Sequence, residues 1–417
     1  AAGPPPSHSI AAAPKSGTKE LLTLFAGHEC SLTMNLVRAL GSTYAAAFLF
    51  LRLGQTYHLL LSHGLLVLVL VATLLYHRPP LSILALPAAM VACVLQWDVL
   101  APQALTNGLA AERGLTVVVT GANSGLGLAS ARALRGVGAT VILGCRSEER
   151  CAAAAALVNA DEPRDAPTAR AVAGLELSSL KSVRRWARRV RGLTRRAARR
   201  GKLVLVANAG MPNNGAHGKT TDEGLQLLTG CMYISHHVLV KALRPTRVVH
   251  ASSDTHHLCS LPLPPLVSPC LSDDFFKPGA PSPTALESSD LMDYSRSKLL
   301  LTLHARAMAE NGFVSRAYAV SYPWVQTNIQ PFMRALDWSR LGLMASAATA
   351  VAPLLVACVA SAERLDQLGP NGGVFLSGQL ELRQALDLPG FRGLNASSLA
   401  RSLWRDTESL LAALPEK

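Results

Sequence analysis

The hydrophobic positions divide the chain into an apolar first quarter and a longer part in which short apolar runs alternate with stretches of helical length. Runs rich in Val, Ile and Leu, which we expect to be strands, occupy Leu115–Val119, Thr140–Gly144, Leu203–Ala207, Arg247–Ala251 and Ser315–Ser321. Buried strands that alternate with helices form parallel sheets covered on both faces. The pattern therefore predicts a doubly wound parallel α/β sheet of the Rossmann type.

A glycine-rich turn follows the first of these runs. Thr120, Gly121, Gly125 and Gly127 come directly after Val119, and a helix-like run comes next. Gly121 permits the turn, Gly125 permits close approach of a pyrophosphate, and Gly127 lets the helix pack tightly on the strand. The helix N-terminus offers free N–H groups to phosphates. The stretch predicts a dinucleotide site, with a glycine turn that binds nothing as the alternative.

The first hundred residues have a different pattern. We expect residues 1–35 to be disordered or to form a targeting-like segment, because their beginning is rich in Pro, Ala and Ser. Residues 36–100 contain the apolar stretches 58–76 and 81–97. The first is long enough to span a bilayer and the second is marginal in length. They predict a membrane anchor of transmembrane helices ahead of the α/β domain, with buried helices of a soluble domain as the alternative.

Composition fits a chain that meets a membrane surface. Of the 417 residues, 49% are hydrophobic, and the formal charge is +13. This charge suits anionic lipids, nucleotides or nucleic acid, but no nucleic-acid motif is present, so we expect no nucleic-acid partner. The eight cysteines form no CxxC pair and no metal-ligand spacing. We therefore expect no metal site, and a reducing compartment or buried thiols in place of a disulfide framework.

Residues 181–202 form a strongly basic segment without any acidic residue. As a helix, it has a thin apolar stripe of Val183, Trp186, Val190 and Leu193. The simplest interpretation is a solvated helix that packs on the sheet through this stripe. Repulsion among so many arginines also suggests a partner, for which anionic membrane lipids are the natural candidate.

The spacing TGxxxGxG of the glycine turn resembles that of the short-chain dehydrogenase/reductase family, and TGANSGLG is most similar to the retinol-dehydrogenase-like branch. An NAG string at 208–210, a run that ends in Ser252 and Ser253, and YxxxK at 294–298 follow in the family's order. The resemblance covers residues 113–413 and implies an NAD(P)-binding domain there.

The resemblance also suggests where further elements lie. It implies that the third strand ends at Leu175–Leu177 and that a later strand lies at Gly373–Ser377. The family has a packed, Ala-rich helix where this chain has the apolar stretch Leu341–Ala360. We therefore expect a packed helix there and not a membrane span.

A set of site residues is implied by the same resemblance. Ser253 holds the substrate oxygen, Tyr294 is the general acid/base, and Lys298 binds the nicotinamide ribose. Tyr294 and Lys298 share a helix face, so we expect the lysine charge to lower the tyrosine pKa. The expected cofactor-binding residues are Thr120, Gly121, Ser124, Gly125, Leu126, Gly127, Arg146, Glu176, Asn208, Ala209, Gly210, Tyr294, Lys298 and Thr327. No acid stands at the end of the second strand, and Arg146 is placed to meet a 2′-phosphate, which favours NADP(H) over NAD(H).

Two positions depart from the family pattern. Met232 stands where a catalytic Asn normally holds a water in the proton relay, and Trp324 replaces a glycine. Nearby, His236 and His237 are interpreted as structural histidines. A proline-rich segment at 261–283 is longer than the family usually has and would suit a substrate or partner loop.

The leading functional prediction is a membrane-anchored NADP(H)-dependent oxidoreductase that acts on a lipophilic alcohol or carbonyl, retinoid-like or lipid-derived. The alternative is a catalytically weakened relative that serves as a structural subunit of a membrane protein complex and retains bound NADPH. The expected location is the membrane of the endoplasmic reticulum or the mitochondrial inner membrane.

Overall fold

The computed structural model describes the part of the chain that contains the α/β domain. It covers residues 108–160, 167–211, 215–253, 255–256, 290–322, 325, 327, 345–375, 382–383 and 396–414. The predicted spans 58–76 and 81–97, the N-terminal segment, the proline-rich segment and Trp324 lie outside these residues. Among the helices that are described, none combines the length and the apolar character needed to cross a membrane.

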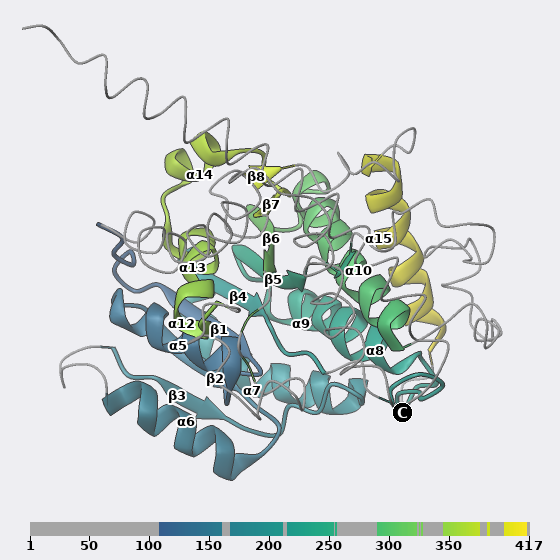
Figure 1. Cartoon of the computed structure of the whole chain (residues 1–417), viewed down its shortest axis with the longest axis horizontal. Coiled ribbons are helices and arrows are strands. Elements are labelled where there is room, and N and C mark those ends of the chain that lie inside the picture. The colour runs from purple at the N-terminus through teal and green to yellow at the C-terminus, as the bar shows by residue number, and fades with distance from the viewer. Residues whose placement is uncertain are drawn as a thin grey trace, which may run out of the picture. The chain divides into compact units, whose positions relative to one another are not determined.

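One sheet organises the described domain, in the strand order β3-β2-β1-β4-β5-β6-β7-β8 (Figure 1). The strands are β1 (Thr116–Thr120), β2 (Thr140–Gly144), β3 (Arg170–Val172), β4 (Leu203–Ala207), β5 (Arg247–Ser253), β6 (Arg316–Tyr322), β7 (Val374–Phe375) and β8 (Leu382–Arg383). Strands β1 to β7 pair in parallel, and β8 runs antiparallel to β7. The order reverses between β1 and β4, which is where doubly wound sheets bind ligands.

Most strands lie where the hydrophobic runs predict them. The bounds of β2 and β4 agree with the prediction, and those of β1, β5 and β6 differ by one or two residues. The expected end of the third strand at Leu177 is wrong, because β3 ends at Val172 and Gly174 turns the chain with φ of +82°. The expectation of a wholly parallel sheet is wrong at its edge, where β8 is antiparallel.

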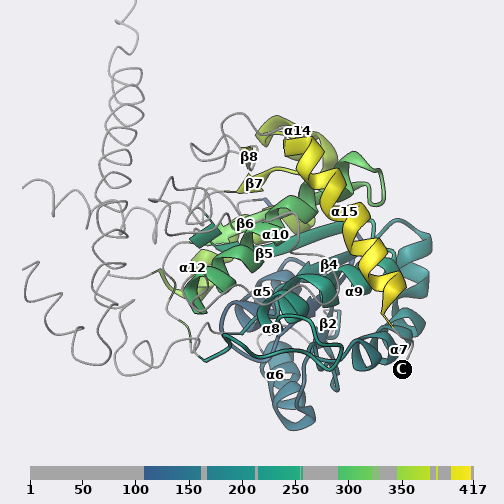
Figure 2. The same ribbon diagram turned by 90° about the vertical axis from the view of Figure 1, so that its right-hand side faces the viewer.

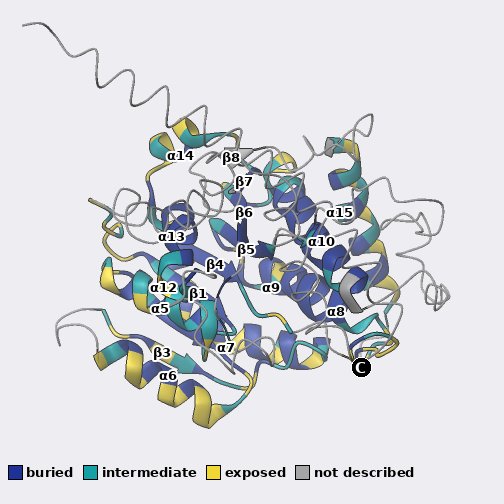
Figure 3. Ribbon diagram, viewed as in Figure 1, coloured by how far each residue is buried: buried dark blue, intermediate teal, exposed yellow. Residues whose placement is uncertain are grey.

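Helices cover both faces of the sheet (Figures 1 and 2). One face packs against α5 (Gly125–Gly136), α6 (Glu148–Ala160), α12 (Ala347–Ala350), α13 (Ala352–Val359) and α14 (Ala362–Leu368). The other face packs against α7 (Leu180–Arg199), α9 (Ser235–Leu243), α10 (Asp290–Glu310) and α15 (Ala396–Ala413). The strands between them are buried, whereas the outer surface of α6 is exposed (Figure 3).

The apolar stretch near residue 350 forms packed helices, as expected. Residues 347–359 fold into α12 and α13, which are interrupted at Val351. Leu354 and Val356 are fully buried in the core beneath the sheet. Arg247 of β5 donates to the carbonyls of Ala357, Cys358 and Ala360 at the end of α13, at 3.0, 2.8 and 3.1 Å. A cation at a helix C-terminus satisfies carbonyls that have no helical partner.

Two of the cysteines form a disulfide that the sequence interpretation did not include. Cys145, directly after β2, is bonded to Cys151 in α6, with a Cα–Cα distance of 5.6 Å. The preference for buried thiols is therefore wrong for this pair, because the turn between β2 and α6 brings the two Cα atoms into bonding range. It holds for Cys231 and Cys358, which are free and buried.

Candidate active site

The predicted site residues gather at the carboxyl edge of the parallel strands. Thr120 ends β1, Asn208 directly follows β4, and Ser253 ends β5. Since these strands are neighbours in one parallel sheet, their ends meet at one edge, and this edge contains the reversal of strand order. The fold thus places residues from distant parts of the sequence around one possible cofactor position.

The glycine turn is closed by backbone contacts that leave no room for side chains. Gly121 and Gly125 have φ values of +66° and +52°, a region that favours glycine. At Gly127, a Cβ atom would lie 2.3 Å from the Gly121 carbonyl oxygen and 2.6 Å from Asn208 Nδ2. The turn therefore presents bare backbone beside the start of α5, which fits the phosphates of a dinucleotide.

The NAG segment is fastened to this turn through Thr120. Thr120 Oγ1 accepts from the N–H groups of Asn208 and Ala209 at 3.0 and 2.9 Å. Asn208 Nδ2 donates to the Thr120 carbonyl at 2.8 Å. Two stretches that the sequence analysis assigned to one cofactor site are thus held against each other by three hydrogen bonds.

The other predicted residues of the glycine turn lie beside it. Ser124 is the N-cap of α5, whose first turn contains no acidic residue. Leu126 packs partly buried against the core. The side chain of Thr327 lies 3.6 Å from the point where a Cβ of Gly125 would be. The structure thus brings Thr327 to the turn from the far end of β6.

At the outer end of the site, Arg146 and Glu176 face each other. Arg146 NH1 lies 3.5 Å from Glu176 Oε2, and their side chains are 77% and 39% exposed. Glu176 Oε1 also accepts from the backbone N–H and the hydroxyl of Ser178 at 3.2 and 3.0 Å. Sequence reasoning gave these residues separate roles and did not predict their ion pair. An exposed pair of this kind is weak, so Arg146 can exchange Glu176 for a phosphate.

Ser253, Tyr294 and Lys298 come together at the inner end. Tyr294 and Lys298 lie one turn apart on α10, and the Tyr294 hydroxyl is hydrogen-bonded to the Ser253 side chain. Lys298 Nζ lies 5.4 Å from the centre of the Tyr294 ring and donates to the Ala251 carbonyl at 2.7 Å. A hydroxyl, a phenol and an amine thus converge where β5 ends.

The protonation of this pair differs from the expectation. Burial raises the pKa of Tyr294 to about 12, although its hydrogen bond with Ser253 acts to lower it. Burial also lowers the pKa of Lys298 to about 7. The expectation that Lys298 lowers the tyrosine pKa is therefore wrong for the protein alone, because removal from water disfavours both charged forms. An amine with a pKa near 7 gains and loses its proton readily at neutral pH.

Met232 occupies the position predicted for the relay Asn. It lies in a π-helical turn, η1 (Gly230–Ile234), and its buried side chain clusters with Leu228 against Tyr294. Its Cε lies 3.7 Å from the point where a Cβ of Gly210 would be. A thioether is at most a weak acceptor and carries no proton. The position therefore offers an apolar contact to Tyr294 in place of a hydrogen-bonding amide.

His236 is a fully bonded structural histidine, as interpreted from the sequence. Burial lowers its pKa to about 4, so the ring is neutral at physiological pH. Its Nδ1 lies 2.7 Å from the Met232 carbonyl and so bears the proton, which leaves Nε2 to accept from the Thr120 hydroxyl at 2.9 Å. His236 thereby ties the Met232 turn to the end of β1.

An ionic group beside Tyr294 was missed by sequence reasoning. The buried carboxylate of Asp293 lies 3.0 Å from His217 Nδ1 and 3.2 Å from Arg296 NH1. It joins α10 to the loop that follows the NAG segment. The only signal in the sequence was an acidic residue directly before Tyr294, three residues ahead of Arg296 in the same helix.

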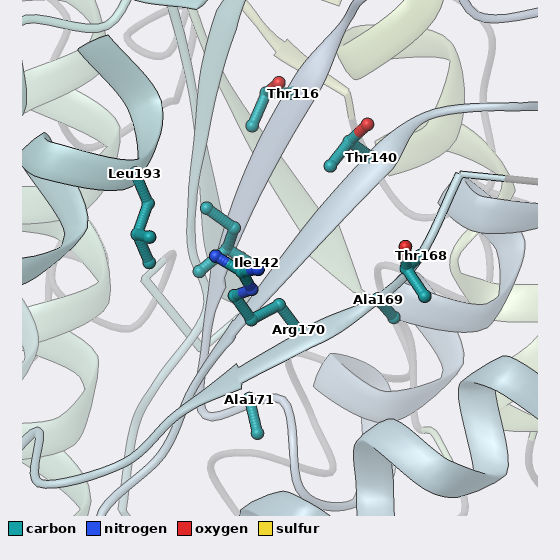
Figure 4. A pocket seen from close by; sticks show the side chains of 8 residues that line it. All are labelled: Thr116, Thr140, Ile142, Thr168, Ala169, Arg170, Ala171 and Leu193. Carbon is teal, nitrogen blue, oxygen red and sulfur yellow. The ribbon is translucent and has the colours of Figure 1, made fainter.

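A hollow on the described surface lies away from this site. Its lining includes Thr116 and Thr140, the first residues of β1 and β2, together with Arg170 and Leu193 (Figure 4). These residues lie at or near the amino ends of the strands. Ligands of doubly wound sheets bind outside the carboxyl ends, so we do not assign the cofactor to this hollow.

Comparison with known proteins shows what part of the chain is similar to. Residues 115–254 match the family model for short chain dehydrogenases. Mouse retinol dehydrogenase 13 is 34% identical over 182 residues, which cover 41% of this chain and 52% of that protein. Bovine dehydrogenase/reductase SDR family member 13 is 34% identical over 210 residues, which cover 49% of each chain. The chain thus spans about half the length of the curated relatives that it matches.

A solved structure shares the fold. The crystal structure of an uncharacterised protein from Mycobacterium paratuberculosis aligns with a TM-score of 0.51 at 24% identity, covering 73% of this chain and 96% of that one. The expected Rossmann-type sheet with helices on both faces is confirmed.

Proposed function

We propose that the protein is a membrane-anchored NADP(H)-dependent oxidoreductase that acts on a lipophilic alcohol or carbonyl, retinoid-like or derived from another lipid. The observation that carries this proposal is the convergence of Ser253, Tyr294 and Lys298 beside the glycine turn. The similarity to retinol dehydrogenase 13 supports the lipophilic class of substrate.

The chain's own residues would divide the chemistry between them. The glycine turn, Asn208 and Thr327 would hold the dinucleotide, which when bound supplies or accepts the hydride. Ser253 donates a hydrogen bond to the substrate oxygen, and Tyr294 gives or takes the proton at that oxygen. Lys298, with a pKa of about 7, restores the protonation state of the site between turnovers.

The test measures the rate of NADPH oxidation by the detergent-purified full chain with a panel of long-chain and retinoid aldehydes as substrates. The Ser253→Ala variant is measured under the same conditions. Turnover that the Ser253 variant loses supports the proposal. NADPH binding without turnover above the variant's background overturns it. That result would favour the alternative of a structural subunit, for which the apolar side chain of Met232 beside Tyr294 is the specific observation.

Arg146 is expected to set the preference for NADP(H). Replacing it by Ala should weaken NADPH binding by about 10- to 100-fold, which corresponds to one lost charge-assisted contact of about 1.5–3 kcal/mol. NADH binding should change little. Titration of both cofactors by fluorescence measures the effect, with the exposed Arg150→Ala as the control of equal charge. Equal losses for NADPH and NADH would contradict this assignment.

The basic helix α7 supports association with an anionic membrane surface. Trp186 and Val190 are buried, as predicted for the apolar stripe, but Leu193 is 44% exposed and does not belong to it. The exposed basic residues of α7 are Lys181, Arg185, Arg188, Arg189, Arg191, Arg195, Arg196 and Arg199. We propose that this face meets anionic lipid headgroups, since each basic residue near such a surface contributes about 1 kcal/mol.

Replacing Arg188, Arg195 and Arg199 together by Gln should weaken binding of the full chain to beads coated with phosphatidylserine. The expected loss is on the order of 100-fold at low salt, because three contributions of about 1 kcal/mol are removed. The control variant carries Gln at the exposed Arg113, Arg150 and Arg170. If the control loses as much affinity as the α7 variant, total charge and not this helix determines binding.

A further inference from the structure

Three fully buried histidines from three elements form one hydrogen-bonded chain. His250 Nε2 in β5 lies 3.2 Å from His304 Nδ1 in α10, and His304 Nε2 lies 3.0 Å from His237 Nδ1 in α9. His237 Nε2 then meets Glu408 Oε1 in α15 at 2.5 Å. All three rings are inaccessible to solvent, whereas the Glu408 side chain is 35% exposed. Helices α10 and α15, which contribute His304 and Glu408, pack side by side (Figure 2).

The carboxylate at the outer end fixes the protons along the chain. Hydrogen bonds from His237 and from Lys241 Nζ, the latter at 2.6 Å, lower the pKa of Glu408 to about 2. The carboxylate is therefore ionised and can only accept. His237 must donate through Nε2, so its Nδ1 accepts from His304 Nε2–H, and His304 Nδ1 accepts from His250 Nε2–H. The Nε2–H of each ring thus points toward the surface.

This arrangement leaves a lone pair at the inner end. His250 Nδ1 is buried and has no hydrogen-bond partner among the described residues. Burying a polar atom without a partner is unfavourable, which a purely structural histidine would avoid. The next residue, Ala251, is the one whose carbonyl accepts from Lys298 Nζ. Burial is the main cause that lowers the pKa of His250 well below its usual value, and the positive charge of Lys298 adds to it.

The site needs a route for protons because Met232 cannot hold the water of the family's relay. We propose that His250, His304 and His237 carry the proton of the reaction between Lys298 and the surface carboxylate of Glu408. This inference rests on the proposed oxidoreductase function. It assigns to these histidines a role in proton exchange beyond packing.

For each proton that enters the histidine chain at His250, one proton leaves it at Glu408. When an alcohol is oxidised, its hydride goes to the dinucleotide and its hydroxyl proton enters the Tyr294–Lys298 pair. Lys298 then loses a proton to His250 Nδ1 across a bridging water, since the two groups are not hydrogen-bonded directly. His250 Nε2–H passes to His304 Nδ1, His304 Nε2–H to His237 Nδ1, and His237 Nε2–H to Glu408 and solvent. Outward transfer leaves the rings as Nδ1–H tautomers, and ring turnover restores the starting tautomers for the next oxidation. Carbonyl reduction, in which the proton moves inward, starts from the Nδ1–H tautomers.

The other groups around the chain do not interrupt it. The Tyr233 ring packs edge-on against His304 at 5.2 Å between ring centres, and its hydroxyl is bonded to Thr407 Oγ1 at 2.7 Å. Trp404 stacks on His304 at 5.7 Å. The titratable groups that act on His250 from outside the chain are His236 and Lys298, and His236 also acts on His304. At the outer end, Glu408 bonds both His237 and Lys241, and Asp406 acts on Tyr233.

The first test does not depend on turnover. Nitrogen NMR of the full chain labelled with 15N-histidine should show the proton of each hydrogen-bonded pair on Nε2 of the inner ring. Lys298→Met should shift the Nδ1 resonance of His250, whereas Lys241→Met, at the outer end, should shift His237 more. Mixed tautomers, or a His250 resonance unaffected by Lys298→Met, would overturn the proposed proton pathway through the histidines even if the protein is an active oxidoreductase.

The second test measures proton movement during turnover. His304→Gln keeps a donor and an acceptor but cannot pass a proton between two ring nitrogens. We expect it to slow steady-state turnover by about tenfold or more, and added imidazole to restore much of the rate. Tyr233→Phe, which touches the same ring, should keep the wild-type rate and pH profile. If His304→Gln turns over at the wild-type rate, the inference is overturned. It is also overturned if both His304→Gln and Tyr233→Phe lose turnover and imidazole does not restore it. An inactive wild type would reject the proposed function and leave the NMR test to decide on the chain.

Discussion

Replacing Tyr294 by Phe is expected to reduce turnover by at least about 10³-fold while leaving NADPH affinity nearly unchanged. The substitution removes only the phenolic oxygen that is bonded to Ser253. General acid–base catalysis by one positioned group contributes about 10²–10⁴-fold, and no other described hydroxyl combines this hydrogen bond with a nearby lysine. Stopped-flow measurement of the nicotinamide absorbance, with cofactor affinity measured separately by fluorescence, separates the chemical step from binding.

A matched control is available on the neighbouring strand. Tyr322 pairs with Ser253 across β5 and β6, and its buried hydroxyl has no partner among the described residues. Tyr322→Phe therefore removes the same atom close to the site without breaking a hydrogen bond, and it should keep both activity and stability. Substantial turnover in Tyr294→Phe would show that another group handles the proton and would remove the main support for the assigned mechanism.

The sheet and the glycine turn were predictable because they depend on short stretches of sequence. An apolar run such as Leu203–Ala207 has few alternatives to a buried strand, and its bounds agree with the structure. The turn is similarly local, since Gly121 and Gly125 must accept positive φ values. The end of β3 was missed because Gly174 turns the chain before the apolar Leu175, a choice that hydrophobicity alone does not reveal.

The site could be located from the sequence, but its electrostatics could not. The YxxxK spacing places Tyr294 and Lys298 on one helix face, yet burial and not their mutual charge sets their pKa values. The histidine chain also could not be predicted from the sequence, since His250, His304 and Glu408 lie far apart in sequence and meet only through packing. His237 was interpreted as structural for this reason: nothing near it in the sequence suggests a proton pathway.

Gly127 is the position where a single methyl group is expected to do the most damage. The added Cβ of Gly127→Ala would lie 2.3 Å from the Gly121 carbonyl oxygen and 2.6 Å from Asn208 Nδ2. The first neighbour is backbone, and the second is fixed by its hydrogen bond to the Thr120 carbonyl. Relief therefore requires the helix to move away from the turn. We expect a loss of about 3 kcal/mol in the free energy of unfolding, and cofactor affinity weakened by about 10²-fold because the phosphate-facing backbone is displaced.

Gly192→Ala is the control that isolates this contact. Gly192 lies within α7 with no atom within 4 Å of its added Cβ, so the same methyl group should stabilise the helix by about 0.5–1 kcal/mol. Denaturant unfolding followed by tryptophan fluorescence reports on both variants, since Trp186 is buried against Gly144. If Gly127→Ala unfolds and binds NADPH like the wild type, the turn has room that this structure does not show. The close packing of α5 on the turn would then not be what shapes the cofactor site.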